Sequence, residues 1–144
     1  MWFDLSNLKY IFFKRGPDLR HKRRGHSCGI LWNESESKNK VVITGGKSDD
    51  ESLFTTEYLE IENYTNGWQY GPNLKHKDDA NSSYILEDST TYSLYLVTQS
   101  KIYRMFSVNS DWDEVRTLDI ERKGHVAMFL PGHLFNEMCP NDRS

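Results

Sequence analysis

The sequence predicts an all-β fold, and three observations support this prediction. Aromatic residues make up 13% of the 144 residues, and most stand singly in a polar background, as is typical of short, half-buried strands. Asn, Asp, Ser and Gly fill the gaps between the short apolar runs, which is the chemistry of tight turns. Parts of the sequence also recur at a fixed interval, so the strands are expected to be organised as a repeat.

The repeat is clearest in two segments related by a constant offset of 55 residues. GPDLRHKRRGH at 16–26 aligns with GPNLKHKDDAN at 71–81, so that Gly-Pro, Leu, a basic residue, His and Lys coincide. A third copy, RTLDIERKGH at 116–125, keeps Leu, Gly and His at the same spacing. Trp68 and Trp112 each stand six residues before the leucine of a copy. These coincident registers predict two successive repeat units.

The first unit is expected to contain four strands, near residues 26–32, 40–45, 56–61 and 68–70. In the third of these, Leu59 and Ile61 share one face, and Tyr58 lies on the other. The run VVI in the second strand does not alternate. A continuous apolar run favours an inner strand that is covered on both faces.

The second unit is also expected to contain four strands, near residues 82–87, 93–98, 102–108 and 112–118. It departs from the first unit in one respect. Thr98-Gln99-Ser100 stands where the first unit has Thr44-Gly45-Gly46, and a shorter loop leads to its third strand. The second unit is therefore interpreted as a degenerate copy.

The adjacent Gly45 and Gly46 have two interpretations. A phosphate-binding loop needs further glycines and a following helix, whereas residues 47–61 are acidic and strand-like. Glycines also end strands where neighbouring sheets crowd together, because they accept backbone angles that a Cβ resists. The pair is predicted to be architectural.

The first unit resembles the Kelch repeat, whose marks are a double glycine, a spaced Tyr and Trp, and a following Gly-Pro-x-Leu. The matching residues are Gly45, Gly46, Tyr58, Trp68, Gly71, Pro72 and Leu74 in the first unit, and Trp112 in the second. The resemblance implies a Kelch-type β-propeller, in which four-stranded antiparallel blades form a ring. It also implies that these marks are structural.

On this resemblance, residues 1–132 form a partial Kelch propeller and residues 137–144 form a tail. The expected parts are a half-blade at 1–16, a blade at 17–72, a degenerate blade at 73–118 and a half-blade at 119–136. Closed propellers use about four to eight blades. Two complete blades with a half-blade at either end are therefore expected to be a fragment of a longer protein or a degenerate copy.

Kelch propellers mostly serve as protein-interaction modules, and the resemblance implies that class here, with another protein as the partner. Partner surfaces in the family lie on one rim, which corresponds to Leu19–Gly25 and Lys47–Thr55. The expected partner-binding residues are Arg20, His21, Lys22, Arg23 and Arg24 in the first loop, and Asp49, Asp50 and Glu51 in the second. Solvated loop charges are the alternative interpretation of each residue.

An enzyme is the rival class, since some similar propellers carry a copper oxidase centre or act on sugars. The repeat places His26 and His125 at equivalent positions of different units, and such residues do not converge on one ion. Neither Cys-x-x-Cys nor Gly-x-Ser-x-Gly occurs. The sequence therefore predicts a non-catalytic chain with no metal or cofactor. Cys28, inside the first strand, is expected to be a small core residue.

Charge and targeting signals say little about the compartment. The net charge of −3 argues against a dedicated nucleic-acid partner, and no apolar run approaches the ~18 residues that a membrane helix needs. The N-terminus has neither a basic leader nor a small-residue cleavage site, so no signal peptide is expected. Asn33, Asn63 and Asn81 each begin an Asn-x-Ser/Thr sequon, which is compatible with a secreted Kelch protein. A cytoplasmic location is nevertheless slightly favoured.

Overall fold

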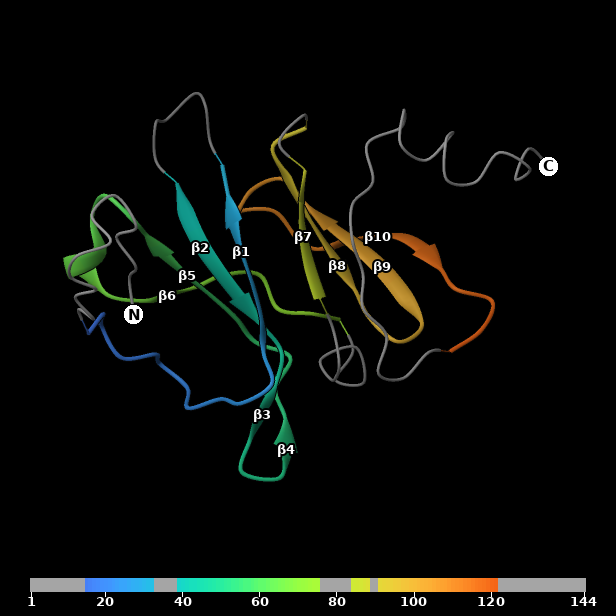
Figure 1. Cartoon of the computed structure of the whole chain (residues 1–144), viewed down its shortest axis with the longest axis horizontal. Helices are drawn as coiled ribbons and strands as arrows, with labels where there is room; N and C mark the ends of the chain where they lie inside the picture. Colours follow the sequence, from blue (N-terminus) through green and yellow to red (C-terminus); the bar gives the residue numbers. More distant parts are fainter. Residues whose placement is uncertain (1–14, 33–38, 76–83, 89–90, 122–144) are drawn as a thin grey trace, which may run out of the picture.

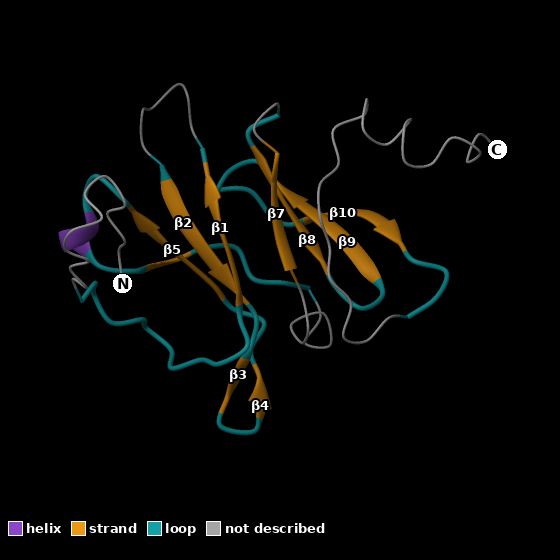
Figure 2. Ribbon diagram, in the orientation of Figure 1, coloured by secondary structure: helices purple, strands orange, loops and turns teal. Residues whose placement is uncertain are grey.

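The computed structural model describes residues 15–32, 39–75, 84–88 and 91–121. These residues form two four-stranded antiparallel sheets and a small hairpin, which confirms the all-β prediction (Figures 1 and 2). The helical part of the described chain is one short 3-10 turn, η1 (Tyr64–Asn66). Most of the two predicted half-blades, and all of the predicted tail, lie outside the described residues.

The first sheet has the strand order β1-β2-β5-β6. Its strands are β1 (Ser27–Leu31), β2 (Lys40–Thr44), β5 (Thr56–Glu60) and β6 (Gln69–Tyr70), each within one residue of its predicted bounds. β2 lies inside the sheet, with Val42 fully buried and Ile43 almost so. Because successive side chains of a strand point to opposite faces, the sheet is covered on both sides here, as the run VVI predicted.

The second sheet has the same sequential order, β7-β8-β9-β10. Its strands are β7 (Tyr84–Asp88), β8 (Ser93–Val97), β9 (Lys101–Met105) and β10 (Asp113–Thr117). The prediction that the third of these extends to residue 108 is wrong. The chain turns after Met105, with the Ser110 N–H donating to the Ser107 carbonyl at 3.1 Å. This turn places Val108 in the core.

A small hairpin occupies part of Lys47–Thr55, the segment that the sequence predicts to be a loop. β3 (Lys47–Ser48) pairs with β4 (Glu51–Ser52), so the turn between them consists of Asp49 and Asp50. Asp49 has a left-handed φ of 51°, a conformation that Asp and Asn adopt more readily than most residues. The hairpin projects from one end of the first sheet (Figure 1).

One hydrophobic core lies between the two sheets, where β1 runs beside β7. Its buried members are Leu31, Val42, Leu74, Leu94, Leu96, Tyr103, Met105, Val108 and Trp112. Gly29 permits the close approach of the two first strands, because a Cβ there would clash with Cγ2 of Ile85 on β7. The sheets therefore pack together through large apolar side chains and, at Gly29, through a position that has no side chain.

Trp112 joins the two sheets by a hydrogen bond as well as by packing. Its indole is fully buried, and Nε1 donates to Oγ1 of Thr56 in β5 at 3.2 Å. Thr56 in turn shares a hydrogen bond of 2.8 Å with Thr44 in β2. Trp68, immediately before β6, is half-buried, and its Nε1 donates to the Pro17 carbonyl at 3.1 Å.

Gly45 and Gly46 follow β2 directly and turn the chain toward the hairpin. Their φ angles are 70° and 85°, in the region where glycine is favoured over residues with a Cβ. A Cβ on Gly46 would also lie 2.6 Å from the carbonyl oxygen of Arg24. Both glycines therefore have the backbone geometry that an architectural role requires.

Candidate interaction surface

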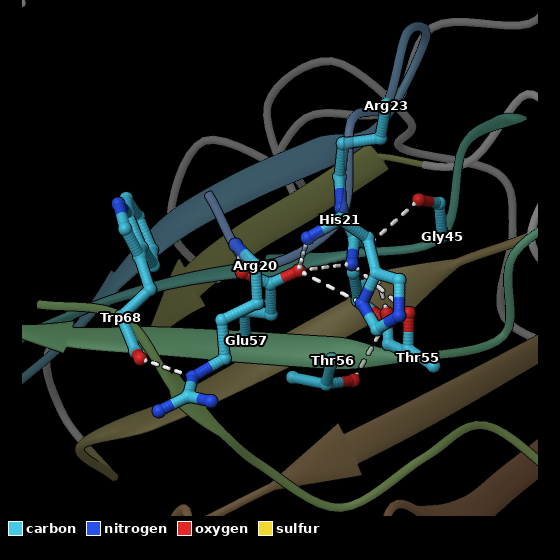
Figure 3. A network of polar contacts seen from close by, with 9 residues as sticks. Arg20, His21, Arg23, Gly45, Thr55, Thr56, Glu57 and Trp68 are labelled. Atoms are coloured by element: carbon cyan, nitrogen blue, oxygen red, sulfur yellow. Dashed lines mark hydrogen bonds and ion pairs between the residues drawn. The ribbon is translucent and has the colours of Figure 1, made fainter. Parts of the chain in front are cut away.

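The basic loop Leu19–Gly25 is fastened to the first sheet by one buried carboxylate, Glu57 of β5. Its Oε2 accepts a hydrogen bond from the Arg20 N–H at 2.8 Å, and its Oε1 accepts one from the His21 N–H at 3.0 Å. Oε1 also accepts a hydrogen bond from Nη2 of Arg23 at 2.7 Å (Figure 3). Because the side chain of Glu57 is fully buried, these three donors replace the water that a carboxylate would otherwise bind.

The side chain of Arg23 does not belong to the exposed surface, and the prediction that it is accessible on the rim is wrong. Its side chain is 0% exposed. Besides Glu57, its guanidinium donates to the carbonyls of Gly45 and Thr55, each at 2.9 Å, and to the Thr55 hydroxyl at 2.9 Å. A buried carboxylate needs a buried cation beside it, and Arg23 supplies that cation.

The surroundings of Glu57 change its pKa in both directions. Burial disfavours the charged form and acts to raise the pKa. The hydrogen bonds from the Arg20 N–H, the Arg23 guanidinium and the His21 N–H, together with the charge of Arg23, favour the carboxylate. Their combined effect is larger, so the pKa of Glu57 lies below its ordinary value and the ion pair is charged at neutral pH.

Glu57 was not among the predicted site residues, although the sequence contains a signal for it. It shares the alternating register of Leu59 and Ile61, which was interpreted as an apolar face. An acidic residue in such a register is rarely buried without a partner. The pattern therefore predicts a buried carboxylate paired with a cation, although it does not identify which of the nearby arginines is the partner.

Arg24 brings the two predicted loops together. Its backbone pairs with that of Lys47 in β3 through two hydrogen bonds of 2.9 Å. Its exposed guanidinium donates to the Asp49 carbonyl at 3.0 Å and lies 3.8 Å from Oδ1 of Asp50. A shallow hollow of about 210 Å³ lies between the loops and is lined by Lys22, Arg23, Arg24, Lys47, Ser48 and Asp49.

Arg20 and His21 face another part of the first sheet. The guanidinium of Arg20 lies over the ring of Tyr70, 4.8 Å from its centroid, and its Nε donates to the Trp68 carbonyl at 2.6 Å. The imidazole of His21 lies 5.6 Å from the same ring, at an angle of 49°. The predicted rim is thus divided between the hairpin, which holds Arg24, and β6, beside which Arg20 lies.

The other predicted residues are accessible. Arg20, Lys22, Arg24, Asp49, Asp50 and Glu51 are exposed, and His21 is half-buried. Seven of the eight predicted partner-binding residues therefore remain available at the surface, on two neighbouring elements.

Metal-ligating side chains do not gather in the parts of the chain that the structure describes. No group of three His, Cys, Asp or Glu residues there is placed to hold an ion, while His76, His125 and His133 lie outside those parts. Cys28 is exposed, contrary to the expectation of a core position, because Ser27 and Gly29 take the buried face of β1. No helix within residues 15–32, 39–75, 84–88 and 91–121 has the length and apolar character to cross a membrane.

Comparison with known proteins adds no assignment, because no protein-family model and no curated protein matches this chain. Any function proposed for the surface therefore rests on its own residues and geometry.

Proposed function

We propose that this chain is a non-catalytic protein-interaction module, and that its two sheets are neighbouring blades of a Kelch-type propeller. Two features support the second part. Both sheets run in sequential order through four antiparallel strands, and the first strand of one contacts the first strand of the other. On this proposal the chain is part of a larger ring or a degenerate copy of one, because two blades are fewer than a ring requires.

The observation that carries the interaction proposal is the anchored backbone beneath exposed charges. Glu57 holds two successive N–H groups of the basic loop, and Arg23 ties the same loop to the strand ends at Gly45 and Thr55. Side chains that project from a fixed backbone lose less entropy when a partner binds. The loop is therefore preorganised for recognition rather than only solvated.

The exposed charges suit recognition by electrostatic complementarity. Lys22, Arg24 and Lys47 stand beside Asp49 and Asp50 at the base and tip of the hairpin. Such mixed patches guide the approach of a partner and discriminate against wrong ones. Because exposed charges are screened over ~8–10 Å at physiological ionic strength, affinity at this surface should fall as salt rises.

Site-specific photo-crosslinking tests the proposal in the intact chain. A photoreactive side chain replaces Asp50 at the hairpin tip or, as the matched control, Thr65 in η1, which follows the opposite end of β5. Both positions are exposed. We expect Asp50 to crosslink a protein that Thr65 does not reach.

The captured protein is then purified and its affinity measured. Arg24→Glu should weaken binding, and added salt should weaken binding to the unmodified chain. A partner that crosslinks only at Thr65 would reject this surface. If neither position captures a protein, the interaction module itself is rejected.

A further inference from the structure

Arg20 differs from the neighbouring arginines in its lack of a carboxylate partner. Arg15 pairs with Asp18 at 2.7 Å, and Arg23 pairs with Glu57 at 2.7 Å. Arg24 lies 3.8 Å from Asp50. Within the described part of the chain, Arg20 forms no ion pair. Among the described residues, no carboxylate therefore pairs with the positive charge of Arg20.

The guanidinium of Arg20 is nevertheless held in place. Its Nε donates to the Trp68 carbonyl at 2.6 Å, and its Cζ lies over the ring of Tyr70, a residue that is 54% exposed. Its own N–H is fixed by Glu57 at 2.8 Å. Neither Nη nitrogen bonds to another described residue, and Figure 3 shows the end of this side chain directed away from Glu57.

We propose that Arg20, supported by Tyr70, binds a carboxylate in an acidic peptide segment of the partner. The planar guanidinium presents paired donors that match the two oxygens of a carboxylate. Its ordering by Trp68 and Tyr70 lowers the entropy lost on binding. This site rests on the proposed interaction function, because it names the chemistry of a segment that the partner would supply.

A carboxylate fits this site better than a phosphate. Phosphate groups on proteins carry a charge of about −1.5 to −2 at neutral pH and are commonly bound by clusters of arginines. Among the described residues at this position, only the guanidinium of Arg20 is unpaired, and Arg23 is already neutralised by Glu57. A single carboxylate matches the available charge.

A defined acidic peptide tests the site in the full chain. N-acetylated hexaglutamate amide is titrated into the protein, and the Nε–Hε resonance of Arg20 is followed by NMR while calorimetry gives the dissociation constant. We expect saturable binding with a shift of that resonance. Arg20→Gln should weaken binding at least about fivefold, because it removes the positive charge and the paired N–H donors of the guanidinium. Arg20→Lys should also weaken it, because a point charge lacks the paired donors.

Matched controls separate this site from general attraction between charges. Arg15→Gln removes the same charge from an exposed position of the same segment, and it should change the dissociation constant less than about twofold. Tyr70→Leu should weaken binding, because it removes the ring on which the guanidinium rests. Hexalysine should not bind.

Three results would overturn the proposal: no saturable binding of hexaglutamate, an equal loss in Arg20→Gln and Arg15→Gln, or inorganic phosphate bound at Arg20 as tightly as the peptide. The first of these, together with a partner captured at Asp50, would reject the Arg20 site and leave the interaction module standing. Capture of no partner would reject the module whatever the peptide does.

Discussion

Two adjacent residues of the same type have opposite environments in this molecule. Arg23 is enclosed and bonded to Glu57, Thr55 and Gly45, whereas the guanidinium of Arg24 lies in solvent beside the hairpin. The difference arises because one buried carboxylate requires one buried cation. Arg23 therefore contributes to stability, while Arg24 is the neighbour that the proposed function assigns to recognition.

Substitution of each arginine in turn should separate these two roles. Arg23→Gln leaves Glu57 buried without its cation and should lower the free energy of unfolding by about 3–5 kcal/mol. Arg24→Gln changes an exposed side chain and should lower it by less than about 0.5 kcal/mol. Urea denaturation of both variants measures the difference. Equal losses would show that Arg23 is not the buried partner.

The ion pair should also give the protein a defined response to acid. The pKa of Glu57 is lower in the folded chain than its ordinary value of 4.5, so its contribution to stability is fully present above the pKa of the unfolded chain. That contribution is lost as the pH falls through the folded pKa. We expect the gap in unfolding free energy between the unmodified chain and Glu57→Gln to be constant near pH 7 and to shrink below about pH 4.5.

Urea denaturation of both proteins between pH 7 and pH 3 measures this gap. A gap that widens in acid would mean that the carboxylate is not stabilised in its charged form. A gap that does not change would assign the effect of Glu57→Gln to packing alone.

Among the elements, β1 and β2 follow from local sequence, because each is a short, largely apolar run with turn residues beyond it, and β5 follows from its alternating pattern. The hairpin formed by β3 and β4, and the early end of β9, did not follow from it. The strands β3 and β4 have two residues each, too few to show a period. β9 ends early because Val108 is drawn into the core after a turn, and apolar character alone resembles continued strand.

The candidate site was partly predictable for a similar reason. The positions of Arg24 and Asp49 side by side follow from two loops that leave the same end of one sheet. The inward turn of Arg23 and the stacking of Arg20 on Tyr70 depend on contacts between residues far apart in sequence. No local pattern distinguishes one arginine from the next.

The contact between β1 and β7 gives an element-scale prediction. Gly29→Ala places a methyl group against Cγ2 of Ile85 and should destabilise the fold by about 1–3 kcal/mol. Ile85→Ala removes that methyl group and should offset part of the loss when the two changes are combined. Thermal or urea unfolding of both single variants and the double variant gives the coupling energy. Additive losses would mean that the strands do not pack at this point.

In the molecule as a whole, side chains from both sheets form a common hydrophobic core among the described residues. Side chains from both sheets surround Trp112, which also donates to Thr56 in the first sheet. Neither sheet could lose this packing without exposing apolar surface of the other. The pair should therefore unfold as one cooperative unit.

Single-tryptophan variants test this cooperativity. One variant retains only Trp68 beside the first sheet, and the other retains only Trp112 beside the second, with the remaining tryptophans replaced by Phe. In each variant, we expect the fluorescence transition to have the same urea midpoint as the circular dichroism transition. A transition of Trp112 at lower urea than the loss of strand signal would show that the second sheet separates first.

The hydrogen bond from Trp112 to Thr56 also makes the exchange rate of the Trp112 indole proton a measure of how often the two sheets separate. The indole N–H is enclosed by both sheets, so deuterium can reach it only when they part or the chain unfolds. Its exchange in heavy water should therefore be among the slowest of all indole protons in the molecule. If it exchanges as fast as that of Trp32, which is 42% exposed, the two sheets part frequently under native conditions. A slow rate would measure, without any denaturant, how rarely one sheet leaves the other.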